Sequence, residues 1–561
     1  MKETLLVNIA SAEARDIILT GGTVLTMAEV ERADAVLVRG DRIVGVGSEV
    51  DCRRAAHDNP RVIDLAGAAL LPGFVDAHCH PLMFGQFSAW VDCSWEAAHD
   101  IGAVVDALRE RAAQQSGRPV RGHGFHHGNV AEQRMLTRHD LDLVATDREV
   151  LVFHSSGHGA IVNSFVLASA GITKETPDPQ GGHFGRDDDG TPNGDVWDAA
   201  ADQLTGALGV KIGNNGPNFH LGDEPDSLLE NLLDAQRRMH TAGVTSVVDA
   251  QVSSREMLTY FRARDTAKLT LRVEMLVISS LLAQLEQLGI GGRLGDDRLA
   301  IAGVKIYVDG ALTAATASFT ESYCCDSSDH GYLYHDPQEL ANLVMRVERL
   351  GLQSGTHAQG DAAITILLDA HEAVRAAGGR CDARHRIEHC GGATREQVAR
   401  IADLGVWPIP QPQYVRRYGQ ELARVLGSER AARIMPLGEF RDAGVTLVIS
   451  SDAPVCPPWP LEAVQAAATR VTISGDLLDG GGDTISVADA LKAHTLGAAA
   501  SIHREKSVGS IEPGKFADFV ILSKDPCAIP MSDLTSIEVL ETWVGGVVVF
   551  SADGRTGAEV S

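Results

Sequence analysis

Short apolar runs of four to six residues, separated by glycine and aspartate, open and close the chain. Runs of this length, bounded by turn residues, are typical of strands in a small sheet. Three lie near the start and two near the end, at residues 16–27, 33–47, 61–73, 508–526 and 538–550. Both ends of the chain are therefore predicted to be strand-rich.

The long region between these ends alternates β-like apolar runs with helical patterns. Helical periodicity occurs, for instance, at Pro337–Leu350, Ala362–Ala377, Thr394–Leu404 and Pro460–Thr469. Repeated strand–helix alternation predicts parallel βαβ units, and about eight such units predict a closed (β/α)8 barrel in an α/β fold. The eight candidate strands are Leu71–His80, Thr245–Ala250, Leu269–Ile278, Leu299–Gly310, Gly351–Asp361, Arg384–Gly392, Leu404–Pro412 and Gly444–Pro454.

One stretch, Met83–Leu229, does not fit a single strand–helix unit. It holds a helical pattern at Ile101–Gln115, a Gly/His-rich loop at Arg121–Asn129 and a polar stretch at 181–196. Loops of this length in a compact domain are usually lids or binding loops. We interpret the stretch as an insertion after the first barrel strand.

Two histidines, His78 and His80, end the first candidate barrel strand. On an extended strand, residues i and i+2 point to the same side, so both imidazoles can reach one metal ion. Barrel active sites lie at this carboxyl-terminal end of the strands. Because the chain has 21 histidines, a chance pair is an equally good explanation of this motif alone.

Lys305 lies inside the apolar run 299–310, where an ammonium group is costly unless it is paired or neutralised. The ordinary interpretation is a lysine whose stem is buried and whose amine reaches solvent. The alternative is that burial lowers its pKa and the neutral amine is carboxylated. The carbamate would be a two-oxygen anion able to bridge two cations.

Three more potential ligands lie at the ends of other candidate strands: His357, His389 and Asp452. Each has a structural alternative when taken alone, such as a turn or helix cap for Asp452. Together with the His78–His80 pair and Lys305, they place five features at the ends of separate strands. These ends meet at one rim of a barrel, so the joint pattern predicts a metal centre there.

The amino-acid composition limits the classes of partner that the protein could bind but does not indicate its reaction. The 49 basic and 75 acidic residues give a formal net charge of -26, which disfavours nucleic acid and anionic membrane surfaces. The first residues lack a secretory pattern, and no apolar run has the length of a membrane span. The nine scattered cysteines predict reduced thiols. We expect a cytoplasmic protein that acts on a small molecule.

The order of these motifs resembles that of the amidohydrolase superfamily. The phrases LPGFVDAHCHP, VKIYVDGALTAATA, THAQGD, RIEH, QPQ, SSDAP and SVGSIEPGKFADFVIL resemble the branch that includes N-substituted formamide deformylases. SSGHGAIVNSFVLASAGI resembles the insertion motif of that branch. The resemblance runs from about Asp16 to Phe550. It implies a distorted (β/α)8 TIM barrel at 71–504, with the insertion at about 83–229, and a small β-sandwich built from 1–70 and 505–561.

The resemblance also implies a binuclear centre, with zinc the expected metal. His78, His80 and Asp452 would hold one ion, His357 and His389 the other, and N6-carboxylated Lys305 would bridge them. The implied reaction is hydrolysis of an amide-type carbon–nitrogen bond, in which Asp452 moves the proton. The substrate class would be an N-substituted formamide or N-acyl amine.

Residues around the ligands have weaker sequence signals. His158 is our candidate for polarising or orienting the substrate, with a structural loop histidine as the alternative. Glu388 and Asp361 lie beside ligand histidines and are candidates for orienting them, although Asp361 is also placed to cap a helix. We expect Asn163 and Asp309 to have structural or supporting roles.

Three departures from the branch leave the substrate open. Gly124–Phe125–His126–His127 stands where a Gly-Trp-Asp-like turn is usual, and Ala311 and Ala315 replace a serine and an arginine. We expect these positions to border the substrate region, where His126 and His127 are either pocket residues or a solvated pair.

Two rival functions are a heterocycle deaminase or cyclic amide hydrolase on the same barrel, and a metal-free scaffold. Lys305 argues against the deaminase, because such enzymes generally use one metal. The complete ligand set argues against the scaffold. A homodimer formed through surface helices is a further expectation.

Overall fold

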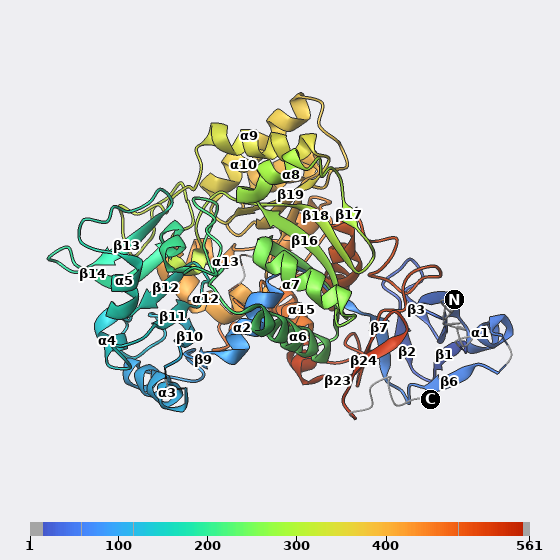
Figure 1. Cartoon of the computed structure of the whole chain (residues 1–561). Helices are drawn as coiled ribbons and strands as arrows, with labels where there is room; N and C mark the ends of the chain where they lie inside the picture. Colours follow the sequence, from blue (N-terminus) through green and yellow to red (C-terminus); the bar gives the residue numbers. More distant parts are fainter. Residues whose placement is uncertain (1–14, 58, 116, 479, 481, 554–561) are drawn as a thin grey trace, which may run out of the picture.

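The computed structural model describes residues 15–57, 59–115, 117–478, 480 and 482–553. Seven parallel strands form a nearly closed barrel at its centre, in the order β21-β20-β19-β18-β16-β15-β8 (Figure 1). The carboxyl ends of these strands face the same rim, which places the predicted ligands together. The strands are β8 Phe74–Cys79, β15 Val244–Val252, β16 Arg272–Ile278, β18 Leu299–Tyr307, β19 Gln353–Ala358, β20 Arg386–His389 and β21 Trp407–Ile409.

The predicted eighth strand at Gly444–Pro454 is wrong as a regular strand, since this segment has no strand ladder. It nevertheless fills the gap between β21 and β8. Ser450 N–H donates to the Pro410 carbonyl at 3.1 Å, and Asp452 N–H donates to the His78 carbonyl at 2.8 Å. The backbone leaves the extended conformation at Asp452, where φ is +59°, and the proline that follows has no N–H to donate.

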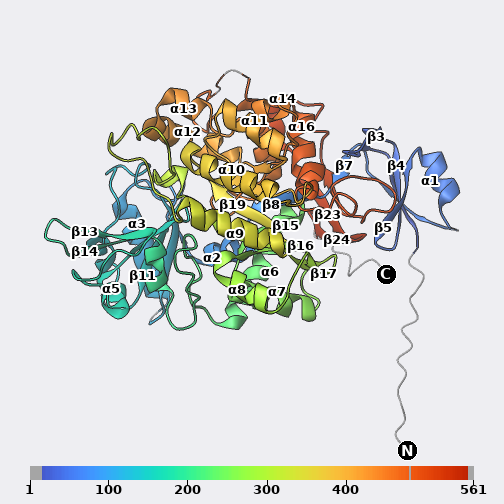
Figure 2. The ribbon, with the colours of Figure 1, turned by 90° about the horizontal axis from the view of Figure 1, so that it is seen from above.

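Helices cover the outside of the barrel (Figures 1 and 2). The four helical patterns of the sequence are confirmed as α9 Pro337–Arg349, α10 Asp361–Ala376, α11 Arg395–Leu404 and α15 Pro460–Thr469. In α10 the inward stripe Ile364, Leu367 and Leu368 is fully buried in the main core. Among the described residues, no helix combines the length and apolar character needed to cross a membrane.

The region between the first two barrel strands forms a six-stranded sheet of its own, in the order β13-β14-β12-β11-β10-β9, on the left of Figure 1. Helix α3 Ile101–Gln114 confirms the predicted helix. The sheet consists of β9 Val91–Asp92, β10 Val120–Phe125, β11 Val150–His154, β12 Gly159–Val162, β13 Gly182–Arg186 and β14 Pro192–Asp198.

Two loop predictions in this region are wrong. The Gly/His-rich stretch begins as strand β10, and the polar stretch 181–196 forms the β13–β14 hairpin. Gly122 explains the first error, because a Cβ at this residue would lie only 2.7 Å from Cys93 Sγ. This glycine allows close packing within a strand, whereas we interpreted it as a loop residue.

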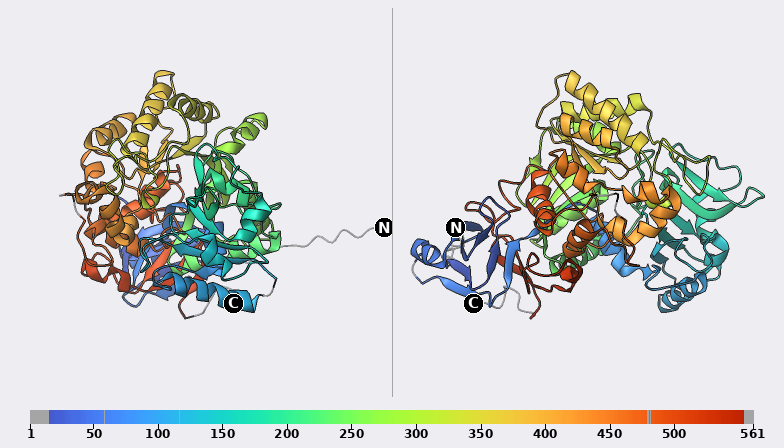
Figure 3. Two further views of the ribbon diagram at one scale, coloured as in Figure 1. Left: turned by 90° about the vertical axis from the view of Figure 1, so that its left-hand side faces the viewer. Right: turned by 180° about the vertical axis from the view of Figure 1, so that it is seen from behind.

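The chain ends contribute two further sheets, on the right of Figure 1 and the left of the right-hand view in Figure 3. One has the order β5-β4-β1-β6, with β1 Ile17–Thr20, β4 Ala35–Arg39, β5 Arg42–Gly47 and β6 Arg61–Asp64. The other, β24-β23-β22-β7-β2-β3, joins strands from both ends: β2 Thr23–Leu25, β3 Arg32–Ala33, β7 Ala69–Pro72, β22 Phe519–Leu522, β23 Val539–Val544 and β24 Val547–Ser551. The composite β-sandwich domain stays a prediction.

A buried ion pair ties the barrel to the C-terminal strands. The Arg272 guanidinium on β16 makes two hydrogen bonds to Asp518, of 2.6 and 3.0 Å, and stacks 3.6 Å from the centre of the Phe516 ring. Asp518 also accepts a 2.7 Å hydrogen bond from Gly545 N–H. Both charged side chains are less than a tenth exposed.

We expect Asp518→Asn to destabilise the protein by about 3–5 kcal/mol, because the substitution leaves a buried guanidinium without its charge partner. Denaturant unfolding measures this change. Asp525→Asn is the control, since its partner Arg32 is half exposed and such pairs contribute about 1 kcal/mol or less. Equal effects of the two substitutions would contradict this account.

Candidate metal centre

Five of the six predicted ligands line one small cavity of about 20 Å³ at the carboxyl-terminal rim of the barrel, enough for about one water molecule. They lie at the ends of strands β8, β19 and β20 and in the segment after β21. The five are His78, His80, His357, His389 and Asp452. The Lys305 Nζ does not line this cavity, but it lies 4.5 Å from the centre of the Tyr307 ring, which does.

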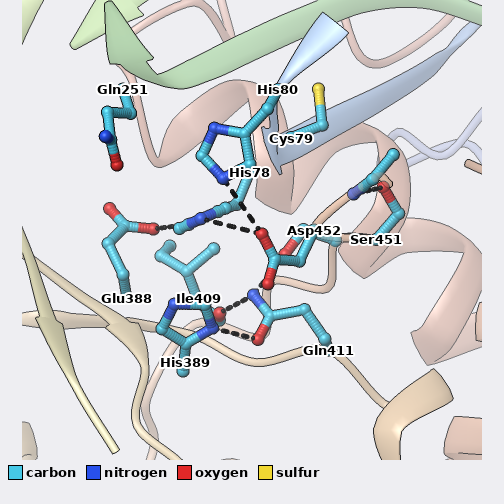
Figure 4. A network of polar contacts seen from close by, with 12 residues as sticks. His78, Cys79, His80, Gln251, Glu388, His389, Ile409, Gln411, Ser451 and Asp452 are labelled. Carbon is cyan, nitrogen blue, oxygen red and sulfur yellow. Dashed lines mark hydrogen bonds and ion pairs between the residues drawn. The ribbon is translucent and has the colours of Figure 1, made fainter. Parts of the chain in front are cut away.

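The ligand atoms face one another closely. Asp452 Oδ1 lies 3.4 Å from His78 Nε2 and 3.2 Å from His80 Nε2. Figure 4 marks both contacts with dashed lines. His78, His389 and Asp452 each offer an atom within 4.8 Å of the other two. The His357 and His389 ring centres are 4.5 Å apart, so all four histidines form one cluster.

The tautomer of His78 is fixed by Glu388. His78 Nδ1–H donates to Glu388 Oε2 at 2.5 Å, which leaves Nε2 buried and without a hydrogen-bond partner. Burial raises the pKa of Glu388, but Arg386 and His78 more than offset this and hold the pKa of that carboxyl below its usual range. Glu388 therefore orients a candidate ligand, although this is His78 and not the neighbouring His389.

We expect Glu388→Gln to weaken metal binding about 10–100-fold, because the anionic acceptor that orients His78 becomes neutral. Competition with a chromogenic chelator measures this affinity. Glu439→Gln is the control, since Glu439 pairs with surface arginines far from the site. Unchanged affinity in Glu388→Gln would refute the orienting role.

Two other histidines are oriented in the same way. His389 Nδ1–H donates to Gln411 Oε1 at 2.7 Å, while the Gln411 amide donates to the Ile409 carbonyl and to Ser450 Oγ. His357 Nε2–H donates to the Gly310 carbonyl at 2.9 Å. Each bond leaves the opposite ring nitrogen with a free lone pair, the form in which histidine binds metals.

Burial keeps His80 neutral. Desolvation lowers the pKa of His80 to about 4, even though Asp452 acts in the opposite direction. Its Nδ1 is buried without a hydrogen-bond partner in the described structure. A neutral imidazole beside a carboxylate is a suitable donor pair for a divalent transition metal.

Lys305 is fully buried on β18, and its Nζ has no hydrogen-bond partner among the described residues. Desolvation lowers the pKa of this amine to about 8, with Glu388 and Asp452 acting against the shift. An amine in this state is partly neutral near neutral pH, as carboxylation requires. The interpretation of Lys305 as a solvent-reaching lysine is wrong.

Asp452 stays ionised in spite of its burial. Desolvation raises its pKa, but the adjacent His78 and His80 rings hold that pKa well below its usual range. The Tyr414 hydroxyl donates to the other carboxylate oxygen. Asp452 thus offers an anionic oxygen to the cavity while Tyr414 holds its second oxygen.

Three site residues have left-handed backbone conformations that non-glycine residues rarely adopt. The φ angles are +68° at His389, +59° at Asp452 and +51° at Asp198. Such conformations cost about 1–3 kcal/mol each and are retained where surrounding contacts enforce them, often at functional sites.

His158 also lines the small cavity. Its Nδ1–H donates to Asp198 Oδ1 at 2.7 Å, and the same carboxylate accepts from the Tyr334 hydroxyl. The His158 ring lies 5.5 Å from that of His357. The ring is therefore fixed beside the ligand cluster, with Nε2 left for another partner.

The structure gives different roles to the three other candidate residues, Asp361, Asn163 and Asp309. Asp361 does not orient His357; it accepts from Thr320 at the start of α10. Asn163 caps α5 Ser164–Ala170, so its structural role is confirmed. Asp309 accepts three backbone N–H bonds and supports the loops around His357.

The positions that depart from the family pattern lie in different places. Ala311 lines the small cavity, whereas Ala315 does not. His126 lines a larger neighbouring cavity of about 850 Å³. Val455 lines both cavities, so the two adjoin.

Several residues of the site had no sequence signal of their own. Gln411 lies in the QPQ phrase, but only the fold shows that it holds His389. Tyr414 contacts Asp452 and Asp198 contacts His158 from segments far away in sequence, and Arg386 contacts Glu388 on the same strand.

Comparison with known proteins agrees with this geometry. Residues 61–550 match a family described as the amidohydrolase family. An N-substituted formamide deformylase from Arthrobacter pascens is 30% identical over 97% of this chain and 99% of its own length. Protein LONG AFTER FAR-RED 3 from Arabidopsis thaliana is 29% identical over 95% of this chain and 91% of its own.

Solved structures share the fold. An uncharacterized metal-dependent hydrolase from Pyrococcus horikoshii superposes with a TM-score of 0.75 at 24% identity, covering 92% of this chain and 99% of the other. A second, from Pyrococcus furiosus, has a TM-score of 0.72 at 26% identity and covers 91% and 100%.

Proposed function

This chain belongs to the amidohydrolase family and is an enzyme that hydrolyses carbon–nitrogen bonds other than peptide bonds; we propose that its substrate is an N-substituted formamide or N-acyl amine. The observation that carries the proposal is the cluster of oriented histidines around the ionised Asp452. The similarity to a formamide deformylase over nearly the whole chain supports the substrate class.

The residues present fit a divalent metal centre. His78 Nε2 and Lys305 Nζ are buried without hydrogen-bond partners among the described residues, which is costly unless another group satisfies them. Imidazole nitrogens and a carboxylate are the donors that zinc prefers. In the proposal, His78, His80 and Asp452 would hold one zinc ion, His357 and His389 would hold a second, and N6-carboxylated Lys305 would contribute an anionic ligand to both.

Bound metal supplies a Lewis acid for the carbonyl oxygen and acidifies water at neutral pH. The chain supplies the proton transfers. Asp452, with Oδ2 held by Tyr414, takes the proton of the attacking water at Oδ1 and returns it to the leaving amine nitrogen. His158, fixed by Asp198, orients the carbonyl oxygen through Nε2.

The experiment is hydrolysis of a panel of N-formyl and N-acyl amines before and after chelation, with zinc restored afterwards. We expect amine release to be lost with the metal and to return with zinc. A heterocyclic amine and a cyclic imide in the same panel test the rival reactions. Amine release that survives complete metal removal would refute the proposal.

A further inference from the structure

Three histidines outside the catalytic cavity meet at the ends of two strands in the inserted sheet. β10 and β11 are parallel neighbours, with Phe125 opposite His154. His126 and His127 follow β10 directly, and His154 is the last residue of β11. One nitrogen from each of the three rings lies within 4.8 Å of the other two.

The spacing of these rings matches that of the catalytic histidines. The ring centres are 4.9 Å apart for His126–His127, 5.0 Å for His126–His154 and 5.7 Å for His127–His154. Imidazoles around one tetrahedral ion, with metal–nitrogen distances near 2.0–2.1 Å, have ring centres roughly 5 Å apart. Three rings arranged in this way can therefore share one ion.

Two of the rings have unsatisfied nitrogens. His127 Nδ1 and His154 Nε2 are buried and have no hydrogen-bond partner among the described residues. His154 itself is fully buried, and its Nδ1 lies 2.9 Å from Ser156 Oγ. Ser156 N–H also donates to His154 Nδ1 at 3.2 Å, so the lone pair of Nε2 becomes free when this bond is given up and Nδ1–H donates to the hydroxyl instead.

The third ring can join if His126 gives up one hydrogen bond. His126 Nε2–H donates to the Thr313 carbonyl at 3.3 Å, and Nδ1 accepts from Gly128 N–H at 3.1 Å. A metal ion at His126 Nδ1 would replace the hydrogen bond from Gly128 N–H and leave the one to the Thr313 carbonyl in place. His357 is held in the same way by a carbonyl at Nε2.

The surroundings keep the three imidazoles neutral, as metal binding requires. Burial lowers the pKa of His126 to about 4 and lowers the pKa values of His127 and His154. Glu421 supplies a negative charge beside His126 and His127, partly balanced by Arg424. His126 also lines the 850 Å³ cavity, so an ion could enter from that side.

We propose that His126, His127 and His154 bind a further divalent transition-metal ion, separate from the catalytic centre, with zinc favoured by three imidazole ligands. The fourth coordination position would face the large cavity and be open to water or to a substrate group. The site would also brace the loop that carries His158, because Ser156 links the His154 ring to the His158 backbone N–H.

The test is the zinc content of the full-length protein after removal of all metal, reloading with Zn²⁺ and gel filtration. We expect His127→Gln and His154→Gln each to hold about one ion per chain fewer than the wild type. His139→Gln is the matched control, because His139 is exposed in the same inserted region. His389→Gln reports loss from the catalytic centre, so failure of either site is seen separately.

Equal zinc content in the wild type, His127→Gln and His154→Gln would overturn the proposal. Anomalous diffraction at the zinc edge from wild-type crystals tests it without any substitution. We expect a peak in contact with all three rings, at about 2.0–2.1 Å from one nitrogen of each. A peak at the catalytic centre with none among these rings would also overturn it.

Discussion

Asp452→Asn is expected to reduce kcat by about 10²–10⁴-fold, the usual contribution of a general acid–base residue. Among the described residues, Asp452 is the carboxylate that contacts both His78 and His80. The asparagine amide in the variant could not accept a proton from water. The reduction should appear in kcat more than in KM, because the group acts on the reacting atoms. Steady-state kinetics on an N-formyl amine measures it.

Two controls separate this effect from misfolding. Asp403→Asn changes an exposed carboxylate and should leave kcat unchanged. Tyr414→Phe removes only the hydrogen bond to the second oxygen of Asp452, and we expect an intermediate loss. Wild-type kcat in a folded Asp452→Asn protein would rule out the proton-transfer role.

Lys305→Ala is expected to lower kcat on the order of 10²–10³-fold and to release metal, because the bridging anion of the proposed centre is lost. The cavity left by the lysine stem can admit a small carboxylate, so acetate or propionate should restore part of both metal content and activity. A purely structural lysine would not respond to added carboxylate. Metal content and kcat, each with and without propionate, provide the readout.

Lys174→Ala is the control, since Lys174 is half exposed and pairs with Asp189 on the surface. Intact-protein mass under native conditions, with bicarbonate present, should show one added CO₂ in the wild type and none in Lys305→Ala. Full metal content in Lys305→Ala would contradict the bridging role.

The ligand positions could be predicted because a parallel barrel gathers all its strand ends at one rim. His78, Lys305, His357 and His389 each lie within or at the end of an apolar strand run, and the order of those runs gives their neighbours. Predicting these positions requires only the local sequence and a barrel as the template. The assignment of each candidate ligand to one of two metal ions rests instead on the resemblance to the amidohydrolase superfamily.

The support around the ligands could not be predicted, because it depends on contacts between distant segments. Gln411 and Asp198 reach His389 and His158 through loops whose path no periodicity encodes. The positive φ angles at Asp452 and Asp198 likewise arise from tertiary packing. Strand β10 could not be predicted because the sequence does not distinguish Gly122, which allows close packing within a strand, from a glycine in a loop.

The most direct test of the central claim is to follow bound metal and hydrolysis together while a chelator removes metal from the wild-type protein. The account predicts that hydrolysis of an N-substituted formamide falls as metal leaves His78, His80, Lys305, His357, His389 and Asp452, and that zinc restores it. Undiminished hydrolysis by protein from which all metal has been removed would contradict it.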